Sequence, residues 1–304
     1  MKLTFHTLDV FTTRKFAGNP LAVVLGADHL STEQMQTITK EFNLSETTFV
    51  MKPENSNNTA KVRIFFPGGE MPFAGHPTLG TAILLAELNN KPGCTISTEI
   101  RLELKAGLTP VKVTRIADQC SGVFTAPVIP FHIDVKLPSA AQTAQALNLN
   151  TSDVGFDGHT VTSIEGGPRF FYVPVKTRSA LEKSQVREPY WSDLIKPLGN
   201  SVDAAYLYTR GGDGPNVTFR ARMYSPTGGI PEDPATGSAT ALLAAQLLTA
   251  EKLEDGKYHW QLEQGYEMGR PSDLRLEADV EGGVLRAVRV GGSAVRMMSG
   301  EMEI

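Results

Sequence analysis

The sequence predicts an α+β fold with two similar lobes, each built from several strands around one central helix. Two observations carry this prediction. A segment of the first half of the chain recurs in the second half, and both copies contain a helical run without a polar face. With 304 residues, of which 41% are hydrophobic and 20% charged, the chain can bury a core in each of two domains of about 150 residues.

The repeat comprises residues 62–88 and 221–247, which align without a gap at an offset of 159 residues and are identical at 9 of 27 positions. Two strand–loop–helix segments of similar composition would match at some positions by chance. The fixed spacing of proline, glycine and helix start favours a duplication. Arg63 and Arg222 are one identical pair. We expect them at equivalent strand positions, in exposed or interlobe ion pairs.

Each copy of the repeat predicts a strand, a loop and a helix. The loop is rich in proline and glycine, which neither continue a strand nor start a helix early. The helical run is apolar nearly all round, which is typical of a buried helix. The predicted strands are Lys61–Phe66 and Val217–Tyr224, and the predicted helical runs are Leu79–Leu88 and Ala239–Leu248.

Most other segments are typical of strands. A helix begins near Ser31, because Ser31 and Gln34 form a capping-box pattern ahead of apolar residues at helical spacing. Its counterpart in the second half is predicted over Tyr190–Leu198. The further predicted strands are Leu3–Phe11, Leu21–Leu25, Thr47–Met51, Ile100–Leu104, Val111–Arg115, Phe170–Val175, Ala204–Tyr208, Arg275–Leu276 and Leu285–Val290.

A cluster of prolines at Thr125–Pro138 marks the expected linker between the lobes. The predicted domains are residues 1–126 and 127–290. The last strand, Ala294–Ile304, is expected to return to the first lobe, so that residues 291–304 complete it. If the lobes face each other, the two central helices start at one cleft, which is the expected active site.

Composition and charge argue against several classes of protein. The net charge of −4 and the isoelectric point of about 5.9 argue against a nucleic-acid partner. No apolar run approaches the roughly 18 residues of a membrane helix. The N-terminal segment lacks the apolar core of a secretory signal. Cys94 and Cys120 form no CxxC pair, which is consistent with the reduced cytoplasm. We therefore expect a cytoplasmic protein whose partner is a small molecule.

The starts of the two central helices are the first candidate binding site. The N-terminus of a buried helix holds unpaired N–H groups and a partial positive charge, which suit a carboxylate or a developing oxyanion. Gly75 lies at the first start, and Gly237 and Ser238 lie at the second. Such residues can simply cap a helix, and in a single copy that is the commoner role. Their presence in both copies favours a shared anion-binding site.

The two copies differ at residues that can carry protons. The first copy has His76 in AGHPT and the second has Asp233 in EDPATGS. His76 on its own could be an ordinary loop histidine, and Asp233 before a proline is also a good N-cap. Glu46 in NLSETTF is a third candidate, although spacing alone does not distinguish it from Glu41 or Glu70. No histidine has metal-ligand spacing with a partner, so no metal is expected.

Four motifs together resemble the PhzF (phenazine biosynthesis-like) family: DVFTTRKFAGNPLAVVL, EFNLSETTFV, FAGHPTLGTA and GIPEDPATGSA. The resemblance runs from Asp9 to about Leu248 and continues in VRVGGSAV. It implies the diaminopimelate-epimerase-like fold, in which two pseudo-symmetric lobes each wrap a barrel-like sheet around a buried helix. It also implies a homodimer that works without a cofactor.

The resemblance further implies the residues of the site. Carried over motif by motif, the catalytic carboxylate of LSET falls on Glu46. The histidine of AGHPT falls on His76, and the aspartate and serine of EDPATGS fall on Asp233 and Ser238. The family reaction removes a proton from a ring carbon of dihydro-hydroxyanthranilate and returns it to another carbon. Gly75, Gly237 and Ser238 are expected to hold a substrate carboxylate.

The leading hypothesis is a cofactor-independent isomerase that acts by carboxylate acid–base catalysis on a small, cyclic, carboxylate-bearing substrate. An epimerase or racemase of an amino-acid-like compound is the alternative. The related thiol enzymes use one cysteine at the start of each central helix, where this chain has Ala74 and Pro234. Such an enzyme would therefore have to work without cysteine. A second alternative is a small-molecule binding protein without activity.

Overall fold

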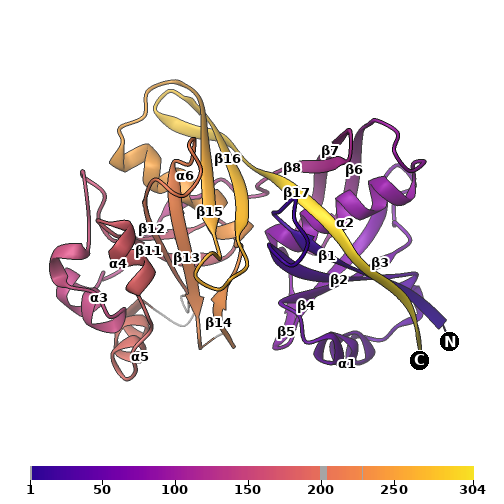
Figure 1. Cartoon of the computed structure of the whole chain (residues 1–304), viewed down its shortest axis with the longest axis horizontal. Helices are drawn as coiled ribbons and strands as arrows, with labels where there is room; N and C mark the ends of the chain where they lie inside the picture. Colours follow the sequence, from indigo (N-terminus) through magenta and orange to yellow (C-terminus); the bar gives the residue numbers. More distant parts are fainter. Residues whose placement is uncertain (1, 199–203, 228) are drawn as a thin grey trace. The chain divides into compact units, whose positions relative to one another are not determined.

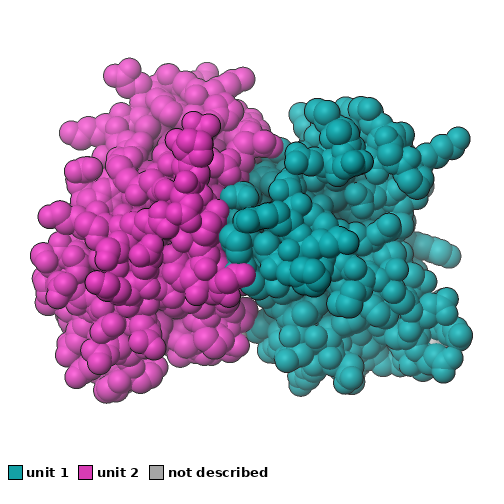
Figure 2. All heavy atoms as spheres, in the orientation of Figure 1, with its two compact units in different colours: residues 1–127, 270–273, 290–304 teal, residues 128–269, 274–289 magenta. Residues whose placement is uncertain are grey.

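The computed structural model describes residues 2–198, 204–227 and 229–304, and it divides into two compact units (Figures 1 and 2). Unit 1 comprises Met1–Pro127, Arg270–Asp273 and Val290–Ile304. Unit 2 comprises Val128–Gly269 and Leu274–Arg289. The last strand of the chain therefore begins in unit 2 and ends in unit 1.

Unit 1 is a sheet closed into a barrel. The order of paired strands is β17–β1–β2–β3–β4–β6–β7–β8, and β8 pairs again with β17, which closes the ring. The short strand β5 pairs only onto β4 among the described strands. The elements are β1 Lys2–Val10, β2 Asn19–Leu25, η1 Ala27–His29, α1 Thr32–Phe42, β3 Glu46–Met51, β4 Ala60–Phe66, β5 Gly69–Met71, α2 Gly75–Leu88, β6 Ile96–Leu104, β7 Gly107–Ile116, β8 Gln119–Thr125 and β17 Val284–Glu303.

Helix α2 is the central helix of unit 1. Its residues are buried from Gly75 to Ala86, and it contacts β1, β2, β3, β6, β7 and β8. Gly80 permits a close approach, because a Cβ atom there would lie 2.6 Å from Leu21 Cδ2 and 2.7 Å from Val10 Cγ2. An apolar helix therefore fills the barrel, as its lack of a polar face predicts.

Unit 2 wraps its strands around a second apolar helix, α6. The strand order is β9–β10–β11–β12–β13–β15–β16–β17, with β14 paired onto β13. Helix α6 packs against β9, β10 and β11. The elements are β9 Phe131–His132, α3 Ala140–Ala146, η2 Thr151–Asp153, β10 Thr162–Glu165, β11 Arg169–Pro174, α4 Arg178–Lys183, α5 Tyr190–Ile195, η3 Lys196–Leu198, β12 Ala205–Arg210, β13 Phe219–Ser225, β14 Ile230–Asp233, α6 Gly237–Ala250, β15 Gly256–Gln264 and β16 Ser272–Glu281.

The two units repeat one topology over their whole length. In unit 1 a parallel pair, β2 and β3, is joined through α1, and in unit 2 a parallel pair, β11 and β12, is joined through α4 and α5. The parallel pair β4 and β6 flanks α2, as the parallel pair β13 and β15 flanks α6. The duplication inferred from 27 aligned positions therefore extends beyond them, and the prediction of an α+β fold with two barrel-like lobes is confirmed.

The capping box predicted at Ser31 is present. Ser31 Oγ accepts from Gln34 N at 3.2 Å, and Gln34 Oε1 accepts from Ser31 N at 2.9 Å. The loops after β4 and β13 differ from the prediction, because each contains a short strand, β5 or β14, that folds back antiparallel. Residue 228 of the second loop lies outside the described residues.

The two arginines of the repeat also differ from their expected setting. Arg63 Nε binds Glu70 Oε1 at 2.8 Å, and Arg222 Nε binds Glu232 Oε1 at 2.8 Å. Each acidic partner follows its arginine in the same unit, so neither of these pairs links two lobes. The Arg222 side chain is only 9% exposed. Each arginine thus stabilises a β-hairpin within its own unit.

Candidate active site

Glu46 and His76 lie together in unit 1. His76 Nε2 lies 3.0 Å from Glu46 Oε2, and both atoms are inaccessible to solvent. The side chains are 9% and 4% exposed for Glu46 and His76. A carboxylate and an imidazole that lie side by side can each take a proton from a bound molecule or give one to it.

A second contact between β3 and α2 lies near this pair. Thr48 of β3 and Thr81 of α2 share a buried hydrogen bond of 2.9 Å between their hydroxyl oxygens. Glu46 is two residues before Thr48, on the same face of the strand. Strand β3 therefore contacts α2 at two places, through Glu46 and through Thr48.

Asn19, the first residue of β2, holds the other side of the His76 ring. Its Nδ2 lies 3.2 Å from His76 Nδ1. An amide nitrogen only donates, so Nδ1 accepts, and a neutral ring then carries its proton on Nε2, which faces Glu46. Sequence reasoning missed Asn19, although it stands in the quoted segment AGNP.

The helix starts are built as the sequence predicts. Gly75 and Gly237 are the first residues of α2 and α6, and both helices have 14 residues. In the described part of the chain, the side chain of neither N-cap residue, Ala74 or Thr236, makes a capping hydrogen bond. Ser238 follows Gly237 and is half-buried. The first N–H groups of α6 are thus available where Gly237 and Ser238 lie.

Asp233 lies at the end of β14, in unit 2, and is buried. Its Oδ2 accepts from the Thr236 hydroxyl at 2.5 Å. Gln264, the last residue of β15, contacts both residues from the other side of the loop. Sequence reasoning missed Gln264, because the residue stands 28 positions after Thr236 and belongs to no quoted motif.

The cysteines take no part in either group of residues. Burial and the Glu87 carboxylate raise the pKa of Cys120 to about 11, which suppresses the thiolate. Cys94 Sγ accepts from Arg115 Nη2 at 3.3 Å. Among the described residues, no three His, Cys, Asp or Glu side chains form a group that could hold a metal ion. In the same residues, no helix is long and apolar enough to span a membrane.

Solved structures place the fold in a known class. A hydroxyproline epimerase of Agrobacterium vitis matches with a TM-score of 0.61 at 12% identity, covering 99% of this chain and 91% of that chain. At this identity the match concerns the fold alone. A PhzF-family phenazine biosynthesis protein of Bacillus anthracis matches with a TM-score of 0.86 at 25% identity, and each chain is fully covered. The protein therefore has the fold that PhzF-family proteins share with epimerases of this type.

Comparison of the amino-acid sequence with known proteins identifies the family. The model of the PhzC-PhzF family, described as phenazine biosynthesis-like protein, matches residues 8–300. The chain belongs to this family. An uncharacterized isomerase of Mesorhizobium japonicum is 40% identical over 297 residues, which are 97% of each chain. The trans-2,3-dihydro-3-hydroxyanthranilate isomerase of Pseudomonas aeruginosa is 33% identical, over 97% of this chain and 98% of its own. The predicted resemblance is confirmed.

Proposed function

We propose that the protein is an isomerase that moves a proton between two carbons of a small, cyclic, carboxylate-bearing molecule without a cofactor. The observation that carries the proposal is the buried contact of 3.0 Å between Glu46 and His76. The substrate named for the Pseudomonas aeruginosa relative, trans-2,3-dihydro-3-hydroxyanthranilate, is of this class. It is the first compound to test.

Glu46 acts first as the base and then as the acid. It takes a proton from a ring carbon, and the electron pair of that C–H bond moves into the ring as the double bonds shift. The protonated Glu46 then returns the proton to another carbon, so that substrate and product have the same composition. General acid–base catalysis by one positioned group contributes roughly 10²- to 10⁴-fold. His76, with its proton on Nε2, shares this proton and holds a polar group of the substrate.

Asp233 is proposed as a further catalytic residue, which holds a polar group of the substrate and assists the movement of the proton. Gly75, Gly237 and Ser238 are the proposed substrate-binding residues. The N–H groups at the start of a helix suit its carboxylate, and Asp233 suits a hydroxyl or amino group. Two features support this assignment: the N-cap side chains leave the helix starts uncapped, and the Asp233 carboxylate is held in place by Thr236. We further propose that the protein is a cytoplasmic homodimer, which light scattering and fractionation would test.

Solvent-deuterium incorporation tests the proposed reaction. The wild-type protein is incubated with trans-2,3-dihydro-3-hydroxyanthranilate in D₂O, and deuterium in the isomerised product is measured by mass spectrometry. Glu46→Gln is expected to lose roughly 10²- to 10⁴-fold in rate. Glu41→Gln, a substitution on the exposed side of α1, is the matched control and should keep the wild-type rate.

Three results would contradict the proposal. Full activity of Glu46→Gln would remove Glu46 as the base. Deuterium at a stereocentre, with the mirror-image compound as product, would indicate an epimerase. Binding of the compound without turnover, unchanged in Glu46→Gln, would indicate a binding protein.

A further inference from the structure

Three side chains of unit 2 form a buried chain of hydrogen bonds that ends on Asp233. Gln264 Nε2 lies 3.0 Å from Thr236 Oγ1, and Thr236 Oγ1 lies 2.5 Å from Asp233 Oδ2. Gln264 is completely buried, and Thr236 and Asp233 are 7% and 5% exposed. None of the quoted family motifs contains Gln264.

The direction of these hydrogen bonds is fixed by the backbone. Thr236 N can only donate, and it binds Gln264 Oε1 at 3.1 Å. The Asp233 carbonyl can only accept, and it binds Gln264 Nε2 at 2.8 Å. Gln264 Nε2 therefore donates to the Thr236 hydroxyl as well. Since that hydroxyl oxygen already accepts, its own proton points to Asp233 Oδ2, which must accept.

We propose that Gln264 is a positioning residue of the active site, which holds the Asp233 carboxylate toward the substrate through the hydroxyl of Thr236. The inference rests on the proposed catalytic role of Asp233. Gln264 does not itself contact the substrate. Its amide ties the loop before α6 at three atoms: Asp233 O, Thr236 N and Thr236 Oγ1.

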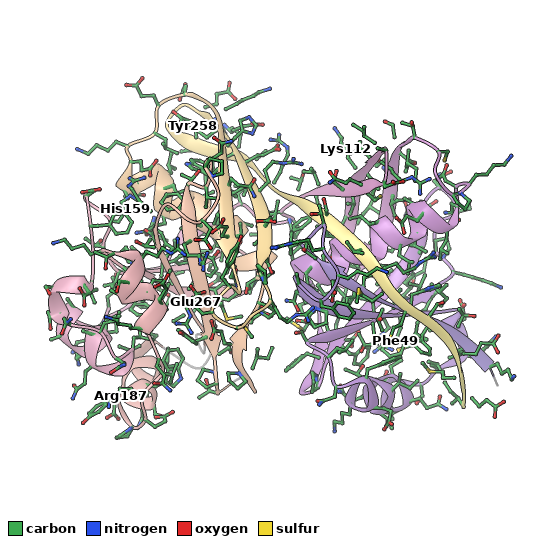
Figure 3. The ribbon with its side chains drawn as sticks, viewed as in Figure 1. Phe49, Lys112, His159, Arg187, Tyr258 and Glu267 are labelled. Atoms are coloured by element: carbon green, nitrogen blue, oxygen red, sulfur yellow. The ribbon has the colours of Figure 1, made fainter. Side chains whose placement is uncertain are left out.

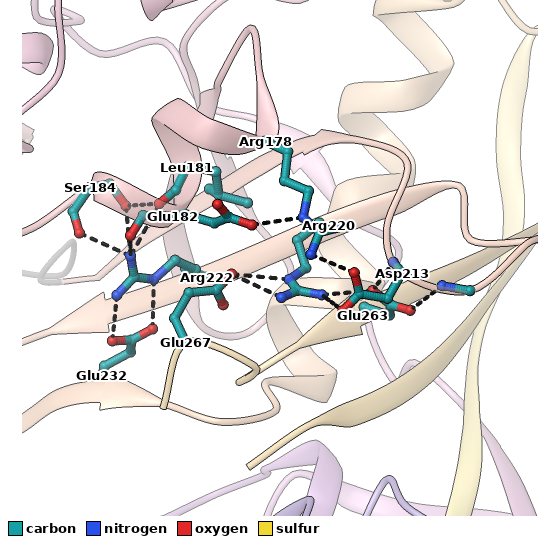
Figure 4. A network of polar contacts seen from close by, with 11 residues as sticks. Arg178, Leu181, Glu182, Ser184, Asp213, Arg220, Arg222, Glu232, Glu263 and Glu267 are labelled. Carbon is teal, nitrogen blue, oxygen red and sulfur yellow. Dashed lines mark hydrogen bonds and ion pairs between the residues drawn. The ribbon is translucent and has the colours of Figure 1, made fainter. Parts of the chain in front are cut away.

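Ion pairs on the opposite face of the same strands hold the residues next to this chain of hydrogen bonds (Figure 4). Neighbouring residues of a strand face opposite sides of the sheet. Glu263, just before Gln264, binds Arg220 Nη1 at 2.8 Å. Glu232, just before Asp233, binds Arg222 at 2.8 and 2.9 Å. Each ion pair thus anchors the residue next to one end of the hydrogen-bonded chain.

Strand β13 supplies both arginines. Arg220 also binds Glu267 Oε1 at 3.0 Å. Arg222 Nη1 donates to carbonyls at the C-terminal end of α4, including that of Ser184 at 2.9 Å. In the pairing of β13 with β15, Arg220 stands opposite Glu263. The ion pair therefore fixes the register that brings Gln264 to the loop before α6. The two arginines thus lie on one face of the strands, and the amide of Gln264 lies on the opposite face, toward the loop before α6.

A pair of Thr236 variants tests the inference with the isomerase assay. Thr236→Val keeps the shape of the side chain but removes the hydroxyl, and Thr236→Ser keeps the hydroxyl. A lost hydrogen bond to a charged group corresponds to roughly a ten- to hundred-fold change. We expect Thr236→Val to lower kcat by this factor with KM nearly unchanged, and Thr236→Ser to retain kcat within about two-fold of wild type.

Gln264→Glu tests the other end of the hydrogen-bonded chain of side chains. It replaces the first test if Thr236→Val does not fold. A carboxylate at residue 264 still accepts from Thr236 N, but it has no proton to donate to Oγ1. We expect a loss of kcat like that of Thr236→Val. Because both substitutions break one chain, the double variant should lose far less than the product of the single losses.

Asp233→Asn separates this inference from the proposed function. If Asp233→Asn and the Thr236 and Gln264 variants are all fully active, the role of Asp233 is wrong. If Asp233→Asn is impaired while Thr236→Val and Gln264→Glu keep the wild-type kcat, the positioning role is overturned and the proposed function stands. If the losses of kcat in Thr236→Val and Gln264→Glu multiply in the double variant, the positioning role is also overturned. A rise in KM with unchanged kcat in Thr236→Val would also overturn the positioning role of Gln264.

Discussion

His159 and Tyr208 share a buried hydrogen bond of 2.7 Å between the imidazole Nδ1 and the phenol oxygen. Arg210 donates to the other ring nitrogen at 3.3 Å, and the Phe156 ring stacks on the imidazole. Figure 3 labels His159 in unit 2. Since a guanidinium only donates, Nε2 accepts and the ring is neutral. Burial, and secondly the charge of Arg210, lower the pKa of His159 to about 4, against a smaller opposing effect of Asp157.

The neutral His159 makes the stability of the fold sensitive to acid. In the unfolded chain its pKa returns to the ordinary histidine value of 6.5, so unfolding takes up a proton between pH 6.5 and about 4. The contribution of His159 is complete above pH 6.5 and is lost as the pH falls toward 4. In urea unfolding from pH 7 to pH 4, His159→Phe should therefore lose less stability than the wild type. Parallel curves would contradict the assignment.

Replacing Thr48 by valine should weaken the contact between β3 and α2. Thr48→Val leaves the Thr81 hydroxyl without its buried partner, which costs about 1–3 kcal/mol in free energy of unfolding. Thr48→Val/Thr81→Val should cost less than the two single substitutions together. Thr39→Val is the matched control, because Thr39 is equally buried but bonds only the Met35 carbonyl within α1. Of these variants, Thr39→Val alone should keep the wild-type turnover.

Removing both cysteines should leave the isomerase active. Cys94→Ala/Cys120→Val takes away the two thiols of the chain and leaves the Glu46–His76 contact in place. We expect turnover within about two-fold of wild type, because a reaction by carboxylate needs no thiolate. In the native protein at pH 8, iodoacetamide should leave Cys120 unmodified. A large loss of turnover in a folded double variant would indicate thiol chemistry.

A buried and an exposed ion pair should differ in their effect on stability. Glu263→Gln leaves the Arg220 charge without its closest buried carboxylate partner, and we expect a loss of about 3–5 kcal/mol. Glu303→Gln removes an ion pair with Lys2 whose side chains are 81% and 64% exposed, and stability should change little. If both substitutions lowered the free energy of unfolding in urea equally, the proposed anchoring of the strands by the arginine ion pairs would be wrong.

The sequence predicted the architecture well because the architecture depends on local patterns. Apolar runs without a polar face indicate buried helices, and the repeat of such a run indicates two lobes. The helix bounds are less regular than the repeat: Gly75 and Gly237 are 162 residues apart, against an offset of 159 in the alignment. Strands β4 and β13 keep the offset of 159, and α2 and α6 differ by 162 at both ends, so the three additional residues lie between β13 and α6.

The contacts within the site were less predictable because their partners are distant along the chain. Glu46 could be chosen over Glu41 only by family resemblance, since its contact with His76 depends on the register of β3 against α2. Strand β15 was missed because two of its four buried residues are polar. Glu263 and Gln264 are buried, yet they resemble surface residues until Arg220 and Thr236 are known to bind them.

The pairing of the last strand with the first has a consequence for synthesis on the ribosome. Lys2 of β1 pairs with Glu303 of β17, and β17 is also the strand that closes the ring of unit 1. The barrel around α2 therefore cannot close until β17 has been translated. During that time β1 and β8 each have an unpaired edge, at which the nascent chain can pair with another chain and aggregate.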